Sequence, residues 1–395
     1  MKGIPVKIII FLILSAVIFS IIAYARGYRF DFKDKTISST GILAISSSPK
    51  AAKVFINEDL KGVTDLNVTL PPGNYTVEIT KEGYISYKRS VVLKGEIVET
   101  IDPILFPINP SLSPLSNLGI VNAVRVAQSD NIVLISENEN ETDGIYLFDA
   151  SSKPITIFAP LKTLILKENL PTGSRLQEAS IMFSHDYKQA ILDVPLGTLV
   201  NSYLISLDSE NQELFNVTNS KEALIGAWDD ERGKEIKKVI ETFPNEIQKT
   251  ASASFNIVDF SPDQTKILYS SNTNSNVPVI INPPLIASNQ STEERNIKFG
   301  NLYVYDKRED KNYRVGDSKL DIENIIWYYD SKRLVYREED RISISSYDST
   351  NKQTVYSGPF ENNFFAVNSE GKLLILANLN PKSNKLPDLY LVGIR

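Results

Sequence analysis

The sequence contains no cysteine, and His185 is its only histidine. Without cysteine the chain cannot form a disulfide, a thiolate nucleophile, a cysteine zinc site or an iron–sulfur cluster, and it lacks the cysteine to which lipoproteins attach lipid. With a single histidine it cannot build a site that needs two imidazole groups. No phosphate-binding loop, dinucleotide fingerprint or serine-hydrolase elbow is present either. We therefore predict no catalytic residue, no metal site and no cofactor.

Basic residues are scarce over most of the chain. Of its 395 residues, 42 are Lys or Arg and 48 are Asp or Glu, which gives a formal charge of −6. Residues 1–35 hold six basic and two acidic side chains, which leaves a charge of −10 on residues 36–395. Nucleic-acid binding needs a basic face that neutralises phosphates, and this acidic body offers none. The length and the 42% of hydrophobic residues indicate two or three packed domains.

An apolar run lies near the N-terminus. Residues 8–25 (IIIFLILSAVIFSIIAYA) carry no charge and are flanked by Lys7 and Arg26. As a helix this run is about 27 Å long, enough to cross a bilayer. A cleavable signal peptide is the alternative, because Ala-Tyr-Ala at 23–25 fits a cleavage site, but the run exceeds the usual apolar core of such peptides. We predict an uncleaved transmembrane anchor and linker over residues 1–35.

Residues 36–107 alternate short β-branched runs with Pro and Gly turns, which predicts a small β-sandwich. The runs Ser-Pro-Lys-Ala-Ala-Lys-Val-Phe-Ile-Asn at 48–57, Leu-Pro-Pro-Gly-Asn-Tyr at 70–75 and Lys-Glu-Gly-Tyr at 81–84 resemble a PEGA domain. The turn Pro-Glu-Gly-Ala of that family stands here as Pro-Lys-Ala-Ala, so Ala51 replaces the glycine and predicts a turn without positive φ. The resemblance implies a non-catalytic β-module, common on bacterial surface and envelope proteins, that serves adhesion or scaffolding.

Residues 108–395 repeat one pattern five times. Each unit has an apolar strand that ends in a turn with an acidic residue, a second apolar strand, a third strand and, in most units, an edge strand such as 154–158. Four strands per unit predict an irregular β-propeller of about five to six blades. Phe-Ser-Pro-Asp at 260–263, followed by Lys-Ile-Leu-Tyr at 266–269, resembles TolB-like and WD40-like propellers. The last unit lacks an outer strand, which we expect residues 101–108 to supply.

Two insertions interrupt the repeat. Residues 221–250 are predicted to be one helical insertion, in which Asp229 or Asp230 caps the helix. Residues 272–300 form a long loop that is rich in Asn, Ser and Pro.

Candidate functional residues are few. Acidic residues recur in the repeat turns, and their recurrence favours a structural role, with the carboxylate bonded to the turn backbone, over a metal ring or a catalytic pair. These residues are Asp130, Asp186, Asp263 and Asp330. The candidate binding group is the run Trp228, Asp229, Asp230 and Glu231, because an aromatic ring beside carboxylates suits a cation or a sugar. Helix capping is the alternative explanation of the same residues.

The predicted fold class is mainly β, with an N-terminal transmembrane helix, a PEGA-like sandwich and a propeller. This combination predicts a non-catalytic protein, anchored in the cell membrane by one span, that binds or scaffolds an envelope protein or cell-wall glycan. Positive charges flank the span on both sides and alone would favour a cytoplasmic body, but the PEGA resemblance favours an extracytoplasmic one. The alternative is a carboxylate-dependent enzyme on envelope glycans, which needs two acids roughly 5–9.5 Å apart in a pocket.

Overall fold

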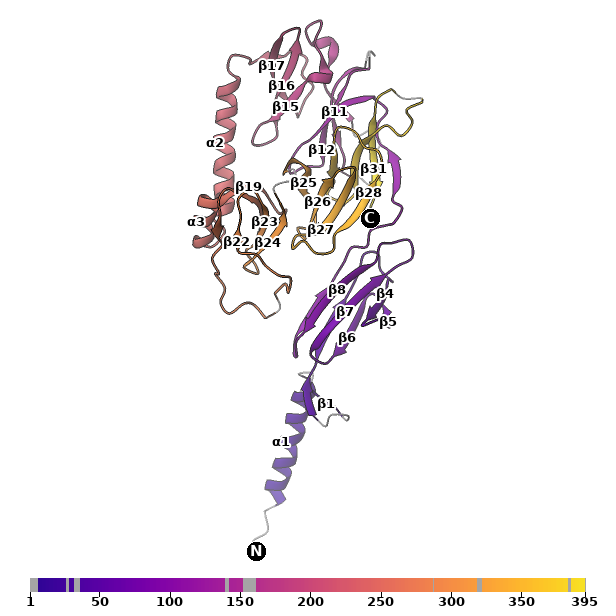
Figure 1. Cartoon of the computed structure of the whole chain (residues 1–395), viewed down its shortest axis with the longest axis vertical. Helices are drawn as coiled ribbons and strands as arrows, with labels where there is room; N and C mark the ends of the chain where they lie inside the picture. The colour runs from indigo at the N-terminus through magenta and orange to yellow at the C-terminus, as the bar shows by residue number, and fades with distance from the viewer. Residues whose placement is uncertain are drawn as a thin grey trace. The chain divides into compact units, whose positions relative to one another are not determined.

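The computed structural model describes residues 6–25, 28–31, 36–138, 142–151, 161–286, 288–317, 322–382 and 385–394. The chain divides into two compact units (Figure 1). Unit 1 consists of Met1–Ile108 together with Leu285–Gln290, and unit 2 of Asn109–Pro284 and Ser291–Ile394. Each unit has its own hydrophobic core, so each is described by itself.

Helix α1 (Val6–Ala25) contains the apolar run. Its large side chains are exposed, from Ile8 at 48% to Tyr24 at 66%. Among the described residues, no helix meets the length and apolarity needed to cross a bilayer. The structure therefore does not support the transmembrane span predicted from the sequence. A short hairpin of β1 (Tyr28–Asp31) and β2 (Thr36–Ser39) follows α1.

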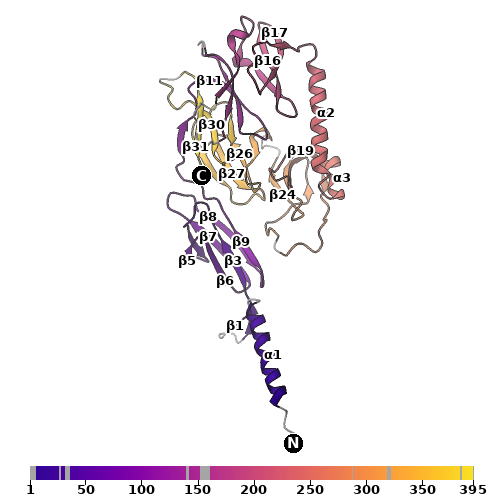
Figure 2. The same cartoon turned by 180° about the vertical axis from the view of Figure 1, so that it is seen from behind.

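The rest of unit 1 is a β-sandwich (Figure 2). One sheet has the strand order β6-β3-β9 and the other the order β5-β4-β7-β8. The strands are β3 (Gly41–Ile45), β4 (Lys53–Ile56), β5 (Asp59–Val63), β6 (Leu66–Leu70), β7 (Gly73–Thr80), β8 (Tyr87–Leu93) and β9 (Val98–Ile101). The period of two places Val77 and Ile79 of β7 in the core that both sheets share.

The turn before β4 differs from its prediction. Ala51 adopts a φ of 59°, in the left-handed region, although the loss of the glycine predicted no positive φ. The Ala51 amide donates to the Thr64 carbonyl at 3.1 Å, and the Ala52 amide donates to Thr64 Oγ1 at 3.1 Å. These bonds hold a conformation that costs an L-residue about 1–2 kcal/mol. The PEGA-type turn is thus kept by its hydrogen bonds and does not require glycine.

The described part of unit 2 contains five four-stranded antiparallel sheets, which we call blades 1 to 5. Blade 1 has β11 (Ile120–Arg125), β12 (Asn131–Ser136), β13 (Gly144–Asp149) and β14 (Leu161–Leu166). Blade 2 has β15 (Ser180–Phe183), β16 (Gln189–Leu196), β17 (Leu199–Ser206) and β18 (Phe215–Asn216). Blade 3 has β19 (Phe255–Phe260), β20 (Lys266–Ser271), β23 (Leu302–Asp306) and β24 (Lys311–Gly316). Blade 4 has β25 (Ile325–Trp327), β26 (Arg333–Glu338), β27 (Arg341–Ser346) and β28 (Gln353–Ser357).

In blades 1 to 4 the strands pair in sequence order, which is the connectivity of propeller blades. The prediction of four-stranded repeat units is confirmed. The edge strand predicted at 154–158 lies outside the described residues, and β14 is the fourth strand of blade 1. Unit 2 also contains the short 3-10 helices η1 (Lys167–Asn169), η2 (Leu176–Glu178) and η3 (Ile322–Asn324).

Blade 5 joins the two ends of unit 2. It has β29 (Phe365–Val367), β30 (Leu373–Ala377) and β31 (Asp388–Gly393), and its outer strand is β10 (Ser111–Pro114), which pairs with β31. A closing strand was predicted, but its placement at 101–108 is wrong. Ile101 and Leu105 are 1% and 0% exposed in the core of unit 1, so that stretch belongs to the sandwich.

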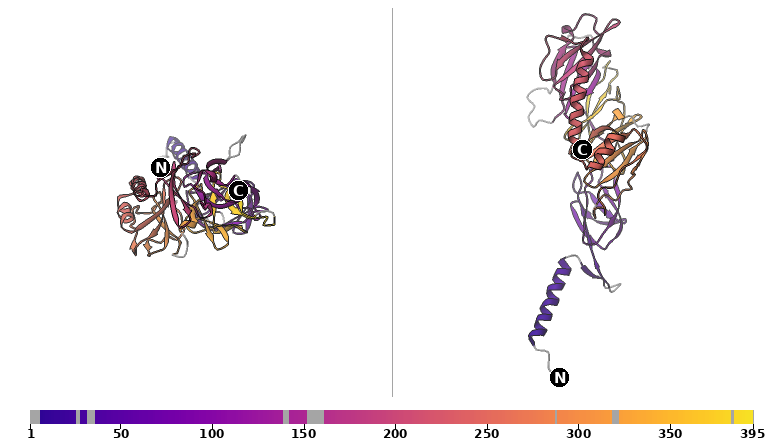
Figure 3. Two further views of the ribbon diagram at one scale, coloured as in Figure 1. Left: turned by 90° about the horizontal axis from the view of Figure 1, so that it is seen from above. Right: turned by 90° about the vertical axis from the view of Figure 1, so that its left-hand side faces the viewer.

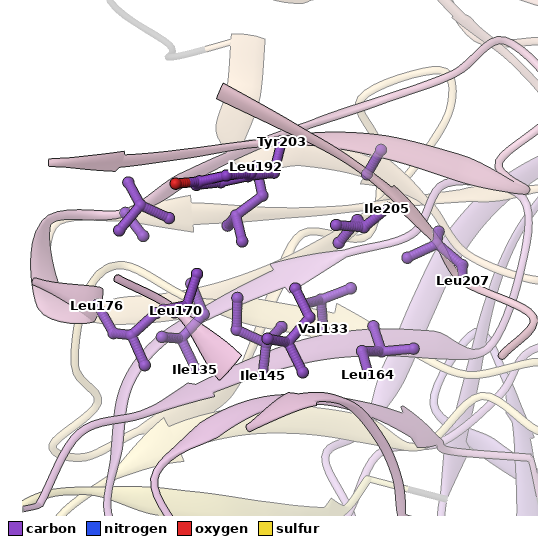
Figure 4. Packing of buried hydrophobic residues seen from close by; sticks show 14 of the residues in the cluster. Val133, Ile135, Ile145, Leu164, Leu170, Leu176, Leu192, Tyr203, Ile205 and Leu207 are labelled. Atoms are coloured by element: carbon purple, nitrogen blue, oxygen red, sulfur yellow. The ribbon is translucent and has the colours of Figure 1, made fainter. Parts of the chain in front are cut away.

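Apolar side chains pack between neighbouring blades. One cluster joins blades 1 and 2, where Val133 and Ile135 of β12 lie against Tyr203 and Ile205 of β17 (Figure 4). Further clusters join blades 5 and 1 and blades 3 and 4. These shared cores hold neighbouring blades side by side. They thereby determine the positions of the strand ends in space.

Two helices follow blade 2, and the second of them lies against the first strand of blade 3 (Figure 3). They are α2 (Lys221–Ile240) and α3 (Asn245–Ser254). The helical insertion predicted over 221–250 is therefore confirmed, but it consists of two helices, because Pro244 cannot continue the amide ladder of a helix. Arg232 Nη2 donates to the Phe183 carbonyl at 3.2 Å, which ties α2 to blade 2. Phe243 packs in the core of blade 3.

The long loop at 272–300 is held by specific bonds. It includes the short strands β21 (Ser275–Asn276) and β22 (Asn296–Ile297). Asp310 Oδ2 accepts from the amides of Ile280 and Ile281 at 2.6 and 2.8 Å. Within unit 1, the Gln290 side chain accepts from the Val92 amide at 2.7 Å and donates to the Val92 carbonyl at 2.9 Å.

Candidate functional site

The candidate binding residues 228–231 lie in the middle of α2. Trp228 is buried, with 8% of its surface exposed, whereas Asp229, Asp230 and Glu231 are exposed. Successive residues of a helix do not face one another, so these four side chains do not converge. Glu231 Oε1 forms an ion pair with Lys234 Nζ at 2.6 Å.

Helix capping does not explain these acids either. Because α2 begins at Lys221, Asp229 and Asp230 lie well inside it and neither is its cap, contrary to the prediction. Residues 221–228 contain no proline and include the good helix formers Ala and Leu, which lets the helix begin earlier. Binding at residues 228–231 stays a prediction, for which the structure provides no convergent geometry.

The recurring turn acids have the structural role that was predicted for them, in three of the four cases. The carboxylates of Asp186, Asp263 and Asp330 each accept from the amide two residues further on, at 3.2, 3.2 and 2.8 Å. The residue after each of these acids has a positive φ, of 54° to 58°. The carboxylate therefore stabilises a tight turn between the first two strands of its blade.

Asp130 of blade 1 departs from this pattern. Its blade has the positive-φ residue at Gln128, two positions before the acid. Ser129 Oγ, which accepts from the Asn131 amide at 3.2 Å, takes the place of the carboxylate in the turn. Asp130 instead accepts from the Ser369 amide at 2.7 Å and from the Ser369 hydroxyl. Asp130 thus joins blade 1 to blade 5, and the predicted turn role for it is wrong.

A cavity of about 640 Å³ opens where the first strands of blades 1, 3, 4 and 5 end. Its wall comes from β11, β19, β25 and β29, from the turns that follow them, and from Val239 of α2. Its ionisable side chains, among the described lining residues, include Arg125, Asp130 and Asp259. The packing of separate blades therefore gathers charged groups that are far apart in the sequence.

Arg125 is the one basic side chain among the described lining residues. Its Cζ lies 5.9 Å from the centroid of the Phe365 ring, within the range of a cation–π contact. Burial lowers the pKa of Arg125, and the nearby Asp259 opposes this effect. No described side chain within 4 Å forms an ion pair with its guanidinium. A guanidinium carries five N–H donors, with which Arg125 can bind the oxygens of a ligand.

Asp259 lies near the end of β19 in the same wall. It accepts a hydrogen bond from the Phe260 amide at 2.8 Å. The side chain is reached by water within the cavity, yet protein atoms surround it closely enough to weaken its hydration. This burial raises the pKa of Asp259 to about 6, and it outweighs the opposing effects of the Phe260 amide and of Arg125.

Apolar side chains complete the wall. Ile326 and Trp327 of β25 and Leu374 of β30 are 8%, 7% and 1% exposed. Trp327 Nε1 has no hydrogen-bond partner among the residues that the structure describes. The site therefore combines an apolar surface with one cation and one incompletely bonded carboxylate, a combination typical of small-molecule pockets.

We also searched the described residues for clusters that could bind a metal ion. In the described ranges, no three or more Asp, Glu or His side chains are grouped so that they could hold a metal ion. His185 lies in the turn of blade 2 between Ser184 and Asp186, as the repeat predicted.

The sequence contained a signal for the cavity residues that its repeat pattern obscured. Arg125 ends the apolar run Ile-Val-Asn-Ala-Val, and Asp259 interrupts the apolar run Asn-Ile-Val-Asp-Phe. A charge within an apolar inner strand is unusual, because inner strands of a propeller are mostly packed. These two positions do not recur between blades, so a search for repeats passed over them.

Comparisons with known proteins agree with the predicted resemblance of unit 1. Residues 40–104 match the PEGA domain family. A search of curated proteins gave no match. Among solved structures, TolB from Acinetobacter baumannii is 12% identical, with 94% of this chain and 67% of that chain covered and a TM-score of 0.20.

Two further solved structures are similar over much of their length. Oligogalacturonate lyase from Vibrio parahaemolyticus is 8% identical, with 73% of this chain and 98% of that chain covered and a TM-score of 0.32. An auxiliary nutrient binding protein from Bacteroides thetaiotaomicron is 10% identical, with 87% and 74% covered and a TM-score of 0.19. TM-scores this low carry no argument about the function of this chain.

Proposed function

We propose that this chain is a non-catalytic binding or scaffolding protein of the cell envelope, and that the cavity of unit 2 receives its ligand, an envelope protein segment or glycan. The observation that carries the proposal is the cavity of about 640 Å³, whose wall holds a guanidinium without an ion-pair partner, an accessible carboxylate and buried apolar side chains. Cavities of this size and composition are typical of ligand sites. The PEGA match of residues 40–104 supports the scaffolding part of the proposal.

Filling the cavity tests the binding part. Ala127 is exposed and lines the cavity, so Ala127→Trp places an indole in its opening. Ala223 is exposed on α2, away from the cavity, and Ala223→Trp is the matched control. We expect immobilised full-length protein and the control to retain the same component of an envelope extract, and Ala127→Trp to lose it. Equal retention by all three proteins, or retention by none, would contradict the proposal.

We also propose that the N-terminal segment holds the protein at the cell membrane, with its body outside the cytoplasm. The exposed apolar side chains of α1 support this, because transfer of each large apolar side chain out of water is favourable by about 1.5–3 kcal/mol. We expect the full-length protein in the membrane fraction and a variant lacking residues 1–35 in the soluble fraction. Protease added to intact cells should digest the body. A protected body would reverse the orientation, and a soluble full-length protein would remove the membrane from the proposal.

A carboxylate-dependent glycan enzyme is the second candidate function, because Asp130 and Asp259 line one cavity. Two hydrogen bonds from Ser369 occupy the Asp130 oxygens, which disfavours Asp130 as an acid or base. We therefore propose binding without turnover. Incubation of the full-length protein with envelope glycans, followed by mass spectrometry, distinguishes the two functions. Products that disappear in Asp259→Asn would establish the enzyme.

A further inference from the structure

Two opposite charges face the cavity without forming an ion pair. Arg125 belongs to β11 of blade 1, and Asp259 belongs to β19 of blade 3. Both side chains line the same cavity, and each affects the pKa of the other. They are nevertheless not within the 4 Å of an ion pair. Each group can therefore still bind an oppositely charged group of a ligand.

Charges that are surrounded by protein are normally paired, because loss of hydration is costly. In this cavity the protein supplies Asp259 with one hydrogen bond, from the Phe260 amide, and supplies Arg125 with a ring contact to Phe365. The side chain of Asp259 is exposed to water in the cavity, yet the surrounding protein raises its pKa to about 6 against the opposing effects of the Phe260 amide and Arg125. A ligand that contacts both groups at once would supply the opposite charges that the protein does not place beside them.

The other ionisable groups near Asp259 do not provide it with an opposite charge. Asp130 is engaged by the amide and hydroxyl of Ser369. Tyr187, from the turn of blade 2, has its pKa raised by burial, and Asp259 contributes to that rise. Arg125 is the one cation that affects Asp259 among the described residues.

We propose that the cavity binds a small zwitterionic ligand, a free amino acid or a short peptide, with its carboxylate on Arg125 and its ammonium group on Asp259. This assignment rests on the proposed binding function of the same cavity. A guanidinium pairs with a carboxylate through two parallel hydrogen bonds, and the reverse pair forms at Asp259. The buried faces of Ile326 and Trp327 offer an apolar surface to the rest of the ligand.

Four derivatives of dialanine test the contribution of each ligand charge to the affinity separately. Dialanine carries both charges, N-acetyl-dialanine only the negative one, dialanine amide only the positive one, and N-acetyl-dialanine amide neither. We expect the full-length protein, measured by isothermal titration calorimetry at pH 7.5, to bind dialanine at least about tenfold more tightly than any other probe, since each charge-assisted contact contributes at least that factor.

Two substitutions assign each charge to its residue. Arg125→Gln should abolish the preference for dialanine over dialanine amide, and Asp259→Asn the preference over N-acetyl-dialanine. Arg175→Gln and Asp208→Asn are controls, because both side chains lie outside the cavity and are exposed. Near-UV circular dichroism of each variant verifies that it is folded.

The pH dependence provides a second, independent readout. Asp259 is mostly protonated at pH 5 and mostly ionised at pH 7.5. Affinity for dialanine should therefore rise roughly tenfold between these values, whereas affinity for N-acetyl-dialanine should fall, since the repulsion by Asp259 grows. The Asp259→Asn protein should show neither change.

The outcomes separate this inference from the function on which it rests. If no probe binds, or the uncharged probe binds as tightly as dialanine, the zwitterionic ligand is wrong. The binding function still stands in that case, provided that Ala127→Trp loses the envelope component and Ala223→Trp keeps it. If cavity filling has no effect on either assay, both proposals fail.

Discussion

Two aspartates four residues apart in blade 3 have opposite surroundings. Asp263, in the turn after β19, accepts from Ser261 Oγ at 2.7 Å and from the amide and hydroxyl of Thr265 at 3.2 and 2.8 Å. Burial alone would raise its pKa, but these bonds outweigh burial and lower the pKa of Asp263 to about 2. Asp259, in the cavity wall, accepts from the Phe260 amide, and burial raises its pKa to about 6.

The difference distinguishes a carboxylate that stabilises the fold from one that is available to a ligand. Oδ1 of the turn acid is bonded by neighbours within its own loop, and Oδ2 forms an ion pair with Arg308 at 3.5 Å, so its charge is already compensated. The cavity acid accepts a hydrogen bond from the Phe260 amide, and its side chain stays exposed to water in the cavity. Recurrence in the repeat therefore points to the structural acids, and the non-recurring Arg125 and Asp259 are the functional candidates.

The largest effect is expected at the turn. Asp263→Ala removes three hydrogen bonds and should lower the free energy of unfolding of unit 2 by about 2–3 kcal/mol. Urea unfolding followed by tryptophan fluorescence measures this, because both tryptophans, Trp228 and Trp327, belong to unit 2. A stability loss below about 0.5 kcal/mol would contradict the structural role of this acid.

A smaller loss is expected at Asp130, which lies between the two cases because it lines the cavity and is also fully bonded. Asp130→Ala removes the two hydrogen bonds from Ser369 and should cost about 1–2 kcal/mol in the same assay. Ser369→Ala, which removes the hydroxyl donor and keeps the amide, should cost less than Asp130→Ala. If the two variants were equally stable, the amide bond would contribute nothing.

The pH dependence of stability should have opposite signs at the two acids of blade 3. The folded pKa of Asp263, about 2, is below its ordinary value of 3.8, so its stabilisation is present above pH 3.8 and is lost as the pH falls toward 2. The folded pKa of Asp259, about 6, is above 3.8, so ionisation destabilises the fold as the pH rises from 4 to 6. Urea titrations from pH 2 to pH 8 on the wild type, Asp263→Asn and Asp259→Asn measure both dependences. If the three proteins had the same pH dependence of stability, the proposed difference between Asp263 and Asp259 would be wrong.

The smallest effect is expected at Asp259 itself. Asp259→Asn removes an exposed charge whose ionisation the surrounding protein disfavours, so stability at pH 7.5 should stay within about 0.5 kcal/mol of the wild type or rise. A loss of more than about 1 kcal/mol would show that the carboxylate has structural partners, and would move Asp259 into the class of the turn acids.

Much of the fold was predictable because it depends on local pattern. The strand predicted at 267–269 lies within β20, and the turn acids bond to backbone amides two residues away. The closing strand of blade 5 was not predictable in the same way. Residues 101–108 and 111–114 both suit a strand, and the burial of Leu105 in the core of unit 1 decides between them. That burial is a tertiary contact, which the local sequence does not contain.

The candidate site was missed for a related reason. Trp228 and the acids after it are adjacent in sequence, but a helix turns their side chains away from one another. Arg125 and Asp259 are separated by more than a hundred residues and meet through the packing of blades 1 and 3 around the cavity. A motif search favours neighbours in sequence, whereas this site is built from the ends of strands that belong to different blades.

The position of β10 has a mechanical consequence. It is the first strand of unit 2 in the chain, yet it completes the last blade beside β31. Since the chain runs from Ile108 directly into β10, tension on the N-terminal part enters unit 2 through blade 5. The four residue pairs from Ser111 with Gly393 to Pro114 with Tyr390 bear that load first. Under force, blade 5 should therefore lose its outer strand while blades 1 to 4, whose strands are contributed by continuous chain, remain intact.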